Sequence, residues 1–259
     1  MEQTNIDLQL IEKEIKDAIV EKDLYRNKMI KIYEEDKLIE KAHMIKIFET
    51  SEIAKKIRNK FVLIDNPVEI HKKVASFKKY KKSYLDSIFL ICKEMKGGKN
   101  NNLFYSYLFM VSHYAELIIK TVLLNKNNEV PTNHAILNIL SNEKDYLFEI
   151  GFKPSYFEYC ICQLKQIGEY AATNDFSMCF RFPFDKNFKS KIITKKMINV
   201  KFSDIEKIVD EQKKLLMIFE LMIVLSEKDF YKKLYEFAKE LLNEIDICLE
   251  KWYVCVIII

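Results

Sequence analysis

Glycine and proline are scarce in this sequence, with only four residues of each among 259. Turns and strand ends depend on these two residues, so their scarcity argues against a fold of many short strands. Lysine, glutamate, isoleucine and leucine are abundant instead, and they suit long helices. The length allows one large domain or two small ones with a sizeable core. The sequence therefore predicts an all-α protein, a multi-helix bundle.

The sequence also lacks a long apolar run. The longest one, Leu215 to Leu225, is interrupted by Glu220, whereas a membrane-spanning helix needs about 20 apolar residues. The N-terminal residues are polar and acidic, unlike a secretory signal. We therefore expect a cytoplasmic protein that does not contact a membrane.

Several signatures of enzymes and metal sites are missing. The six cysteines lie mostly in apolar runs, which predicts reduced, buried thiols. Cys160 and Cys162 lack a second pair of ligands at zinc spacing. No glycine-rich phosphate loop or serine-histidine-aspartate pattern occurs. The sequence therefore predicts neither a metal site nor a cofactor.

Positive charge is concentrated rather than large, because the net formal charge is only +4. Residues 72–82 contain six lysines interleaved with Phe77 and Tyr80, and residues 186–201 contain six lysines and no acid. Such segments can follow a phosphate backbone and stack a base, although a solvated lysine face is the simpler interpretation. The candidate RNA- or ligand-binding residues in them are Lys72, Lys73, Lys78, Lys79, Tyr80, Lys82, Lys191, Lys195 and Lys196.

A domain boundary is predicted at Asn66-Pro67, where Asn66 can cap a helix that Pro67 begins. Residues 1–66 are expected to form an N-terminal helical arm that packs on the rest or contacts a second subunit. Its apolar positions drift too much for a sustained coiled coil. The positions expected to face inward are Ile6, Leu10, Ile15, Ile19, Leu24, Ile30 and Ile39.

Residues 67–259 are expected to form the bundle. Residues 173–202 have no helical periodicity and predict a small β-hairpin insertion. Further on, Ser226 and Asp229 predict a bend into a final helix. The apolar tail, residues 252–259, is either a last helical turn or a strand packed on the body, or a docking site for a partner protein or a second copy.

Two neighbouring predicted helices, near residues 104–124 and 132–140, carry the most informative polar residues. His113, Glu116 and Lys120 are three and four positions apart, so a helix places them on one face. Because this helix is apolar almost all round, we expect these side chains to be half buried and to need partners. His134 lies at the start of the second helix.

This helix pair resembles that of HEPN domains, in which a Glu-apolar-Lys helix precedes a Thr-His-Asx-Leu helix. The resemblance rests on Ala115–Leu124, the loop with Pro131, Thr132–His134 and Leu137–Leu140. Ala135 stands where the family has Asp or Asn. The later segment 175–186, DFSMCFRFPFDK, is similar to an FRYP-type segment of some bacterial HEPN-like proteins, with Phe in place of Tyr. The resemblance covers about residues 100–200.

The resemblance implies a helical bundle. Many HEPN domains are metal-independent ribonucleases of toxin, phage-defence and CRISPR systems, and they usually work as dimers. Their signature is an arginine followed four to six residues later by a histidine. No such pair occurs among the arginines and histidines of this chain, which are Arg26, Arg58, Arg181, His43, His71, His113 and His134. The likeness therefore favours relatives that bind without cleaving.

Three hypotheses follow. The first is a non-catalytic HEPN-like protein of a microbial defence or toxin-antitoxin system that binds RNA, a nucleotide or a partner through Glu116, Lys120, His134 and Arg181. The second is a metal-independent ribonuclease in which His113, Glu116, Lys120, His134 and Arg181 supply base, acid and cation. The third is a purely structural assembly protein that uses the arm and the tail. In a structural interpretation of the same residues, Glu116 and Lys120 pair within a helix and Arg181 anchors the hairpin.

Overall fold

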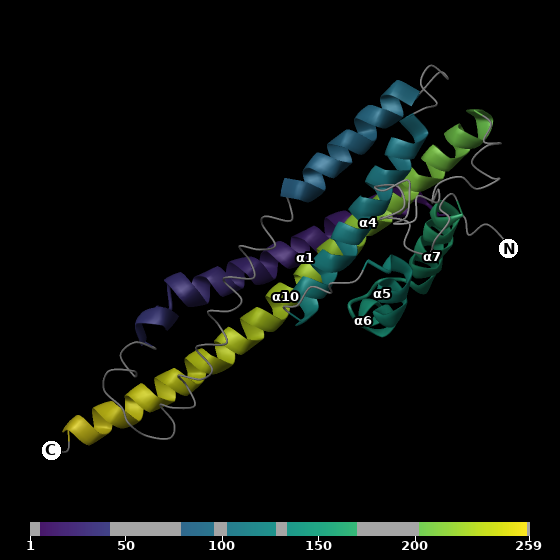
Figure 1. The fold of residues 1–259 in the computed structure, drawn as a ribbon. Helices are drawn as coiled ribbons and strands as arrows, with labels where there is room; N and C mark the ends of the chain where they lie inside the picture. The colour runs from purple at the N-terminus through teal and green to yellow at the C-terminus, as the bar shows by residue number, and fades with distance from the viewer. Residues whose placement is uncertain (1–5, 42–78, 96–102, 128–133, 170–201, 258–259) are drawn as a thin grey trace, which may run out of the picture. The chain divides into compact units, whose positions relative to one another are not determined.

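The computed structural model describes residues 6–41, 79–95, 103–127, 134–169 and 202–257 (Figure 1). Nearly all of these residues are helical, and no strand occurs among them. The prediction of an all-α protein is therefore confirmed for this part of the chain. The predicted domain boundary at Asn66-Pro67 lies outside the described residues. So does the predicted hairpin, except that its last residue, Phe202, begins a helix.

Contacts divide the chain into two compact units, each built from separate stretches of sequence. The bundle unit contains Met1–Lys16 and Val74–Ser226, and the paired-helix unit contains Asp17–Lys73 and Glu227–Ile259. Two helices, α1 (Leu8–Glu34) and α10 (Phe202–Ile257), contribute residues to both units.

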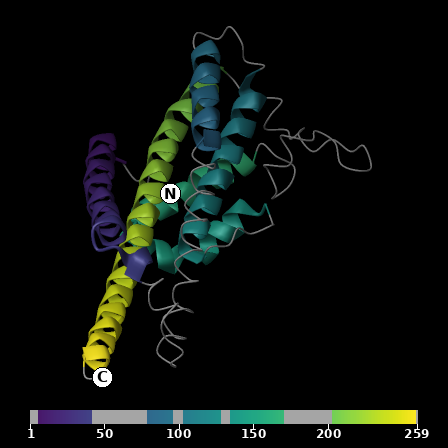
Figure 2. The same cartoon turned by 90° about the vertical axis from the view of Figure 1, so that its left-hand side faces the viewer.

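Helix α4 (Phe104–Asn127) lies at the centre of the bundle unit. Seven apolar residues at helical spacing form its buried core stripe, namely Phe104, Tyr107, Leu108, Val111, Ala115, Ile118 and Val122. A helix over residues 79–95 runs alongside α4 (Figures 1 and 2). The first part of α10 also contacts α4, since Asn125 Nδ2 donates to Ser226 Oγ over 2.9 Å. Apolar residues on nearly every side of α4 explain why it is buried so completely.

Three shorter helices, α5 (Ile136–Asn142), α6 (Lys144–Glu149) and α7 (Pro154–Gly168), follow α4. Both α5 and α7 contact α4, and α5 also contacts α6 and α7. This packing buries one face of α7, made of Tyr156, Phe157, Tyr159, Cys160, Gln163, Leu164 and Ile167.

A glycine ends α6 and turns the chain toward α7. Gly151 has a φ of 94°, a left-handed conformation that residues with a side chain seldom adopt. Its N–H donates to the carbonyl of Phe148, and the N–H of Phe152 donates to that of Leu147. These two bonds form a Schellman motif, and Pro154 then begins α7 at a position that needs no N–H.

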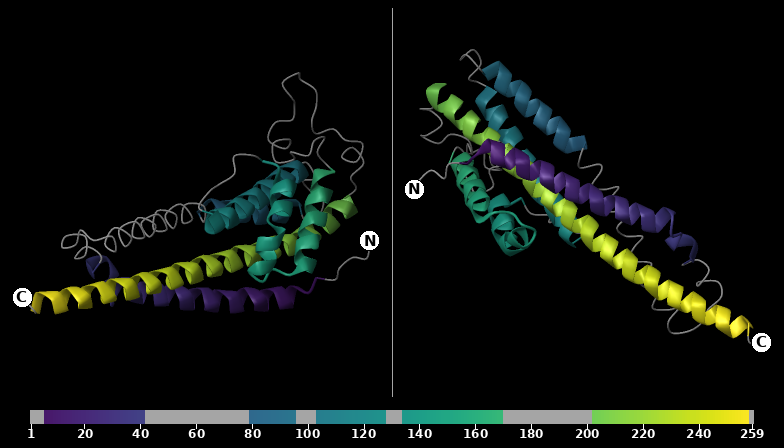
Figure 3. Two further views of the ribbon diagram at one scale, coloured as in Figure 1. Left: turned by 90° about the horizontal axis from the view of Figure 1, so that it is seen from below. Right: turned by 180° about the vertical axis from the view of Figure 1, so that it is seen from behind.

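In the paired-helix unit, the later part of α1 lies beside the later part of α10 (Figure 3). Glu21 pairs with Lys228, and Lys41 pairs with Asp246. The contacts advance along both segments in the same direction, so these segments run parallel.

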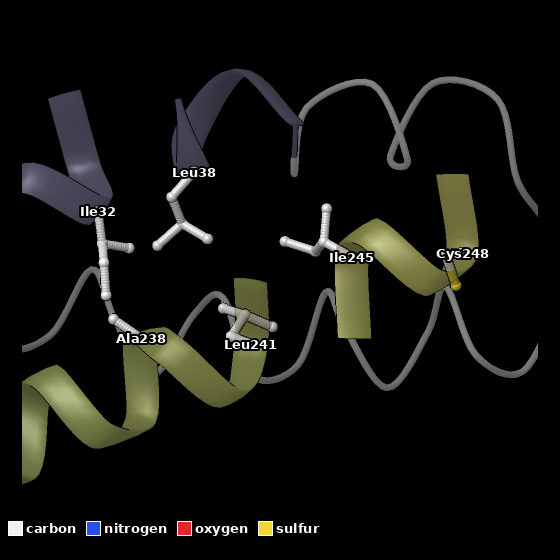
Figure 4. Close-up of a cluster of buried hydrophobic side chains, with 6 residues drawn as sticks. All are labelled: Ile32, Leu38, Ala238, Leu241, Ile245 and Cys248. Atoms are coloured by element: carbon white, nitrogen blue, oxygen red, sulfur yellow. The ribbon is translucent and has the colours of Figure 1, made fainter. Parts of the chain in front are cut away.

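An apolar seam holds these parallel segments together. Figure 4 shows its buried side chains, which are Ile32, Leu38, Ala238, Leu241, Ile245 and Cys248. The four residues from α10 are three, four and three positions apart, which is the spacing of a heptad seam. Burying a leucine or isoleucine completely stabilises a fold by about 1.5–3 kcal/mol. This seam therefore supplies much of the stability of the paired-helix unit.

One prediction about these long helices was right only in part, and another was wrong. The buried positions of α1 include Ile11, Ala18 and Ile32, seven or fourteen positions apart. Of the seven predicted inward positions of the arm, Ile6 is buried, Ile15, Ile19 and Ile30 are half-buried, and Leu10, Leu24 and Ile39 are exposed. The arm has more apolar residues than a narrow seam can cover, so only some of the predicted positions face inward.

The bend predicted at Ser226 and Asp229 is also absent, because α10 continues through both residues. Ser226 Oγ donates to the Ile223 carbonyl one turn earlier, and Asp229 pairs with Lys233 one turn later. Both side chains bond along the helix, so neither one ends it.

The structure describes the side chains of four cysteines, and none of these four forms a disulfide. Cys92, Cys160 and Cys248 are buried, and Cys162 is half-buried. Complete burial raises the pKa of the Cys160 thiol well above its ordinary value. The prediction of reduced, buried thiols is therefore confirmed for three of them.

Candidate ligand-binding site

The candidate site lies in the bundle unit, where α4 meets the residues that precede α5. Glu116 and Lys120 lie one turn apart on α4. His134 precedes α5, which begins at Ile136 without a side-chain cap. The sequence had suggested that Thr132, Asn133 and His134 open this helix. His134 instead turns its imidazole toward α4, while its carbonyl accepts the N–H of Ile136.

Glu116 is the residue of the site that both Lys120 and His134 contact. Its side chain is only 6% exposed, and its Oε1 lies 2.7 Å from Lys120 Nζ and 2.7 Å from His134 Nδ1. Its Oε2 is buried and accepts no hydrogen bond within the described part of the chain. One carboxylate oxygen therefore carries both polar contacts and joins α4 to the start of α5.

These contacts keep the carboxylate charged. Burial, the largest influence, acts to raise the pKa of Glu116, but hydrogen bonds from Lys120 and His134 act against it, and the net effect is a lowered pKa. An ionised carboxylate only accepts hydrogen bonds. Both neighbours must therefore donate to Glu116.

His134 and Lys120 differ in how far they reach solvent. The side chain of His134 is 43% exposed, whereas that of Lys120 is 12% exposed. The imidazole thus combines a buried contact through Nδ1 with an accessible surface. The ammonium mainly neutralises Glu116.

His113 lies beside Glu116, with its Nδ1 3.8 Å from Glu116 Oε2. Its ring stacks on Phe109 and tilts against Tyr84, with ring centroids 5.6 Å and 5.0 Å apart. The aromatic neighbours make His113 a packed residue of the bundle, with 24% of its side chain exposed. The four-residue spacing of Phe109 and His113 could have revealed one contact, but no local pattern points to Tyr84.

A second polar cluster joins three helices of the bundle unit, and sequence reasoning missed it. Lys81 lies 2.8 Å and 3.1 Å from the two oxygens of Glu220, and the hydroxyl of Tyr114 donates to Glu220 over 3.3 Å. Burial and the neighbouring carboxylate raise the pKa of Tyr114. Lys81 belongs to the lysine-rich segment, yet it contributes to a structural contact.

The other lysines of that segment are placed only in part. Lys79, Tyr80 and Lys82 are exposed on the helix of residues 79–95. A shallow hollow of about 470 Å³ on this helix is lined by Lys79, Lys82, Ser83, Asp86, Ser87 and Leu90. The remaining predicted site residues lie outside the described residues; they are Lys72, Lys73, Lys78, Arg181, Lys191, Lys195 and Lys196.

The bundle unit also has a cavity of about 340 Å³ between the helix of residues 79–95 and the start of α10. It is lined by Cys92, Met95, Ile205, Glu206, Val209, Asp210 and Lys213. None of the predicted site residues lines this cavity. Among the described residues, no three histidine, cysteine or acidic side chains are grouped so that they could hold a metal ion.

One described helix has the length and composition needed to cross a membrane. It spans Phe104–Lys126 with a mean hydropathy of 1.4, and 72% of this window is buried inside the protein. The buried core helix of a soluble protein has the same properties, so this is weak evidence for a membrane span.

Comparison with models of known protein families, with curated proteins and with solved structures finds no significant match to this chain.

Proposed function

We propose that this chain is a HEPN-like helical protein of a microbial defence or toxin-type system, which binds RNA at the surface around His134 without cleaving it. The observation that carries the proposal is the pair of 2.7 Å contacts on Glu116, which bring together three of the residues that the family resemblance singles out. With these contacts made, the His134 imidazole is still accessible to solvent, and it lies beside the ion pair of Glu116 with Lys120. Exposed lysines at 79 and 82 add a second contact surface for phosphates in the same unit.

Binding without cleavage agrees with the state of Glu116. Its lowered pKa and its two donors make it a poor acceptor of a further proton. The arginine-histidine signature of HEPN ribonucleases is also absent from the sequence. Glu116 therefore serves the site as a counter-ion.

A titration with a labelled single-stranded RNA at two salt concentrations tests this function. Phosphate contacts release counter-ions, so the affinity must fall steeply as salt rises. His134→Ala should weaken binding, whereas Asn138→Ala, an exposed position on α5, should not. If the two variants bind the RNA with equal affinity, the surface around His134 is not the RNA-binding site.

A metal-independent ribonuclease is the second candidate, and the 2.7 Å contact between Glu116 and His134 favours it. A carboxylate that orients an imidazole is a common arrangement for a general base. Incubation with RNA in EDTA separates the candidates, because binding alone leaves the RNA intact. Cleavage by the wild type that His134→Ala abolishes would establish the enzyme.

Self-association, or a partner protein, is proposed for the arm and the apolar tail. Deleting residues 254–259 and measuring the mass in solution tests the contribution of the tail. A protein that binds no RNA at either salt concentration, but changes from an oligomer to a smaller assembly when residues 254–259 are deleted, would instead be an assembly protein.

A further inference from the structure

We infer that Glu116 is a positioning residue that keeps the proton of His134 on Nδ1, so that Nε2 accepts a hydrogen bond from a sugar hydroxyl of the bound RNA. The second half of this inference rests on the proposed function. The first half concerns the free protein and stands on the geometry of the site together with the charge of Glu116.

The position of the proton follows from what each group can do. Glu116 is charged, so it has no hydrogen to give. A separation of 2.7 Å between His134 Nδ1 and Glu116 Oε1 requires a hydrogen bond, and the imidazole must supply the hydrogen. A neutral imidazole has one N–H, so Nε2 then carries a lone pair.

Burial makes this arrangement rigid. The side chain of Glu116 is 6% exposed, and the Lys120 ammonium lies 2.7 Å from the same oxygen. Rotating the carboxylate away would break two charge-assisted hydrogen bonds at once. The carboxylate therefore holds the imidazole at a fixed angle, in the way that an outer carboxylate orients histidines in many sites.

The chemistry of Nε2 selects the ligand group. A nitrogen lone pair repels phosphate oxygens but accepts a hydrogen bond from a hydroxyl. The hydroxyl nearest the phosphates of RNA is the ribose 2′-hydroxyl, which DNA lacks. His134 should thus contribute to a preference for RNA over DNA, while lysines supply the attraction common to both.

Nitrogen-15 NMR of the ligand-free protein tests the first half. At mildly alkaline pH, the His134 ring should show a protonated Nδ1 and an unprotonated Nε2; the resonances are assigned by their loss in His134→Gln. Glu116→Gln should shift the proton toward Nε2, since an amide can donate to Nδ1. A wild-type ring protonated on Nε2 would overturn the inference without any variant.

Two substitutions test the second half. In His134→Asn, the side-chain amide occupies the position of Nδ1, so it can still bond to Glu116, but no acceptor remains at the position of Nε2. In His134→Gln, the longer side chain places its amide near the position of Nε2, where its oxygen can accept a hydrogen bond. The wild type should bind RNA about tenfold more tightly than DNA of the same sequence, the effect of one hydrogen bond. His134→Asn should keep its thermal stability and lose this preference, and His134→Gln should retain part of it.

The outcomes separate this inference from the proposed function. If the wild type binds no RNA, the proposed function and the hydroxyl contact both fail, while the NMR result still decides the role of Glu116. If RNA binds but His134→Asn keeps the full preference for RNA over DNA, the proposed function survives and the hydroxyl contact is wrong.

Discussion

The core of the bundle unit and the seam of the paired-helix unit differ in their polar content. In the bundle unit, polar contacts join separate helices inside the fold, as Asn125 and Ser226 do. In the paired-helix unit, the seam around Leu241 is apolar, and the ion pair of Lys41 with Asp246 lies at its partly exposed margin. Buried polar contacts specify one arrangement of several helices, whereas a heptad seam aligns two segments through the spacing of its apolar residues, with ion pairs beside it.

The same substitution in both units tests how tightly each core is packed. Leu164→Ala in α7, at a fully buried position of the bundle unit, should lower the free energy of unfolding by about 4 kcal/mol. Several helices surround this site, so the cavity cannot collapse. Urea unfolding followed by circular dichroism measures the loss. The adjacent exposed Lys165→Ala serves as the control and should change stability by about 0.5 kcal/mol or less.

Leu241→Ala makes the matching cavity in the seam of the paired-helix unit. Its cost should be smaller, about 3 kcal/mol, because two parallel segments can move together to fill the space. The same urea experiment measures it, with the exposed Glu240→Ala as control. A larger loss for Leu241→Ala than for Leu164→Ala would reverse the comparison of the two cores.

A double-mutant cycle on Asn125 and Ser226 tests the buried polar contact. Both side chains are buried, so removing Ser226 leaves the Asn125 amide without this acceptor, whereas Ser226 keeps its bond to the Ile223 carbonyl when Asn125 is removed. We expect a coupling energy of about 1 kcal/mol between Asn125→Ala and Ser226→Ala. Additive effects would show that this contact contributes no specificity to the bundle unit.

The same cycle on Lys41 and Asp246 tests the margin of the seam. These side chains are 32% and 44% exposed, so their coupling should be about 0.5 kcal/mol or less and should vanish in high salt. If the coupling energy of Lys41 and Asp246 equals that of Asn125 and Ser226 and persists in high salt, the two units do not differ in the strength of their polar contacts.

Most of the features of the fold and the site that could be predicted from the sequence are repeats within a short stretch of residues. The core stripe of α4 repeats at helical spacing, and Glu116 and Lys120 are one turn apart, so both features are visible in a short window of sequence. The turn at Gly151 could be predicted for the same reason, because glycine and Pro154 mark it within four residues.

Contacts between distant residues could not be predicted. Lys81 and Glu220 are 139 positions apart, and nothing near either residue distinguishes Lys81 from the exposed lysines beside it. The inward face of α1 was misjudged because the excess apolar residues Leu10 and Leu24 obscure the seven-residue repeat. Which of two apolar positions is covered depends on the partner segment, and a single helix does not contain that information.

The turn at Gly151 has a stereochemical consequence. A Cβ atom built on this residue would meet nothing within 4 Å, so only the sign of φ opposes a side chain there. L-alanine would cost about 1–2 kcal/mol in this left-handed conformation. The mirror-image amino acid favours it, so D-alanine introduced by chemical ligation should stabilise the protein by about 0.4–1 kcal/mol through a less disordered unfolded chain. The handedness of one residue, rather than its size, determines what this position accepts.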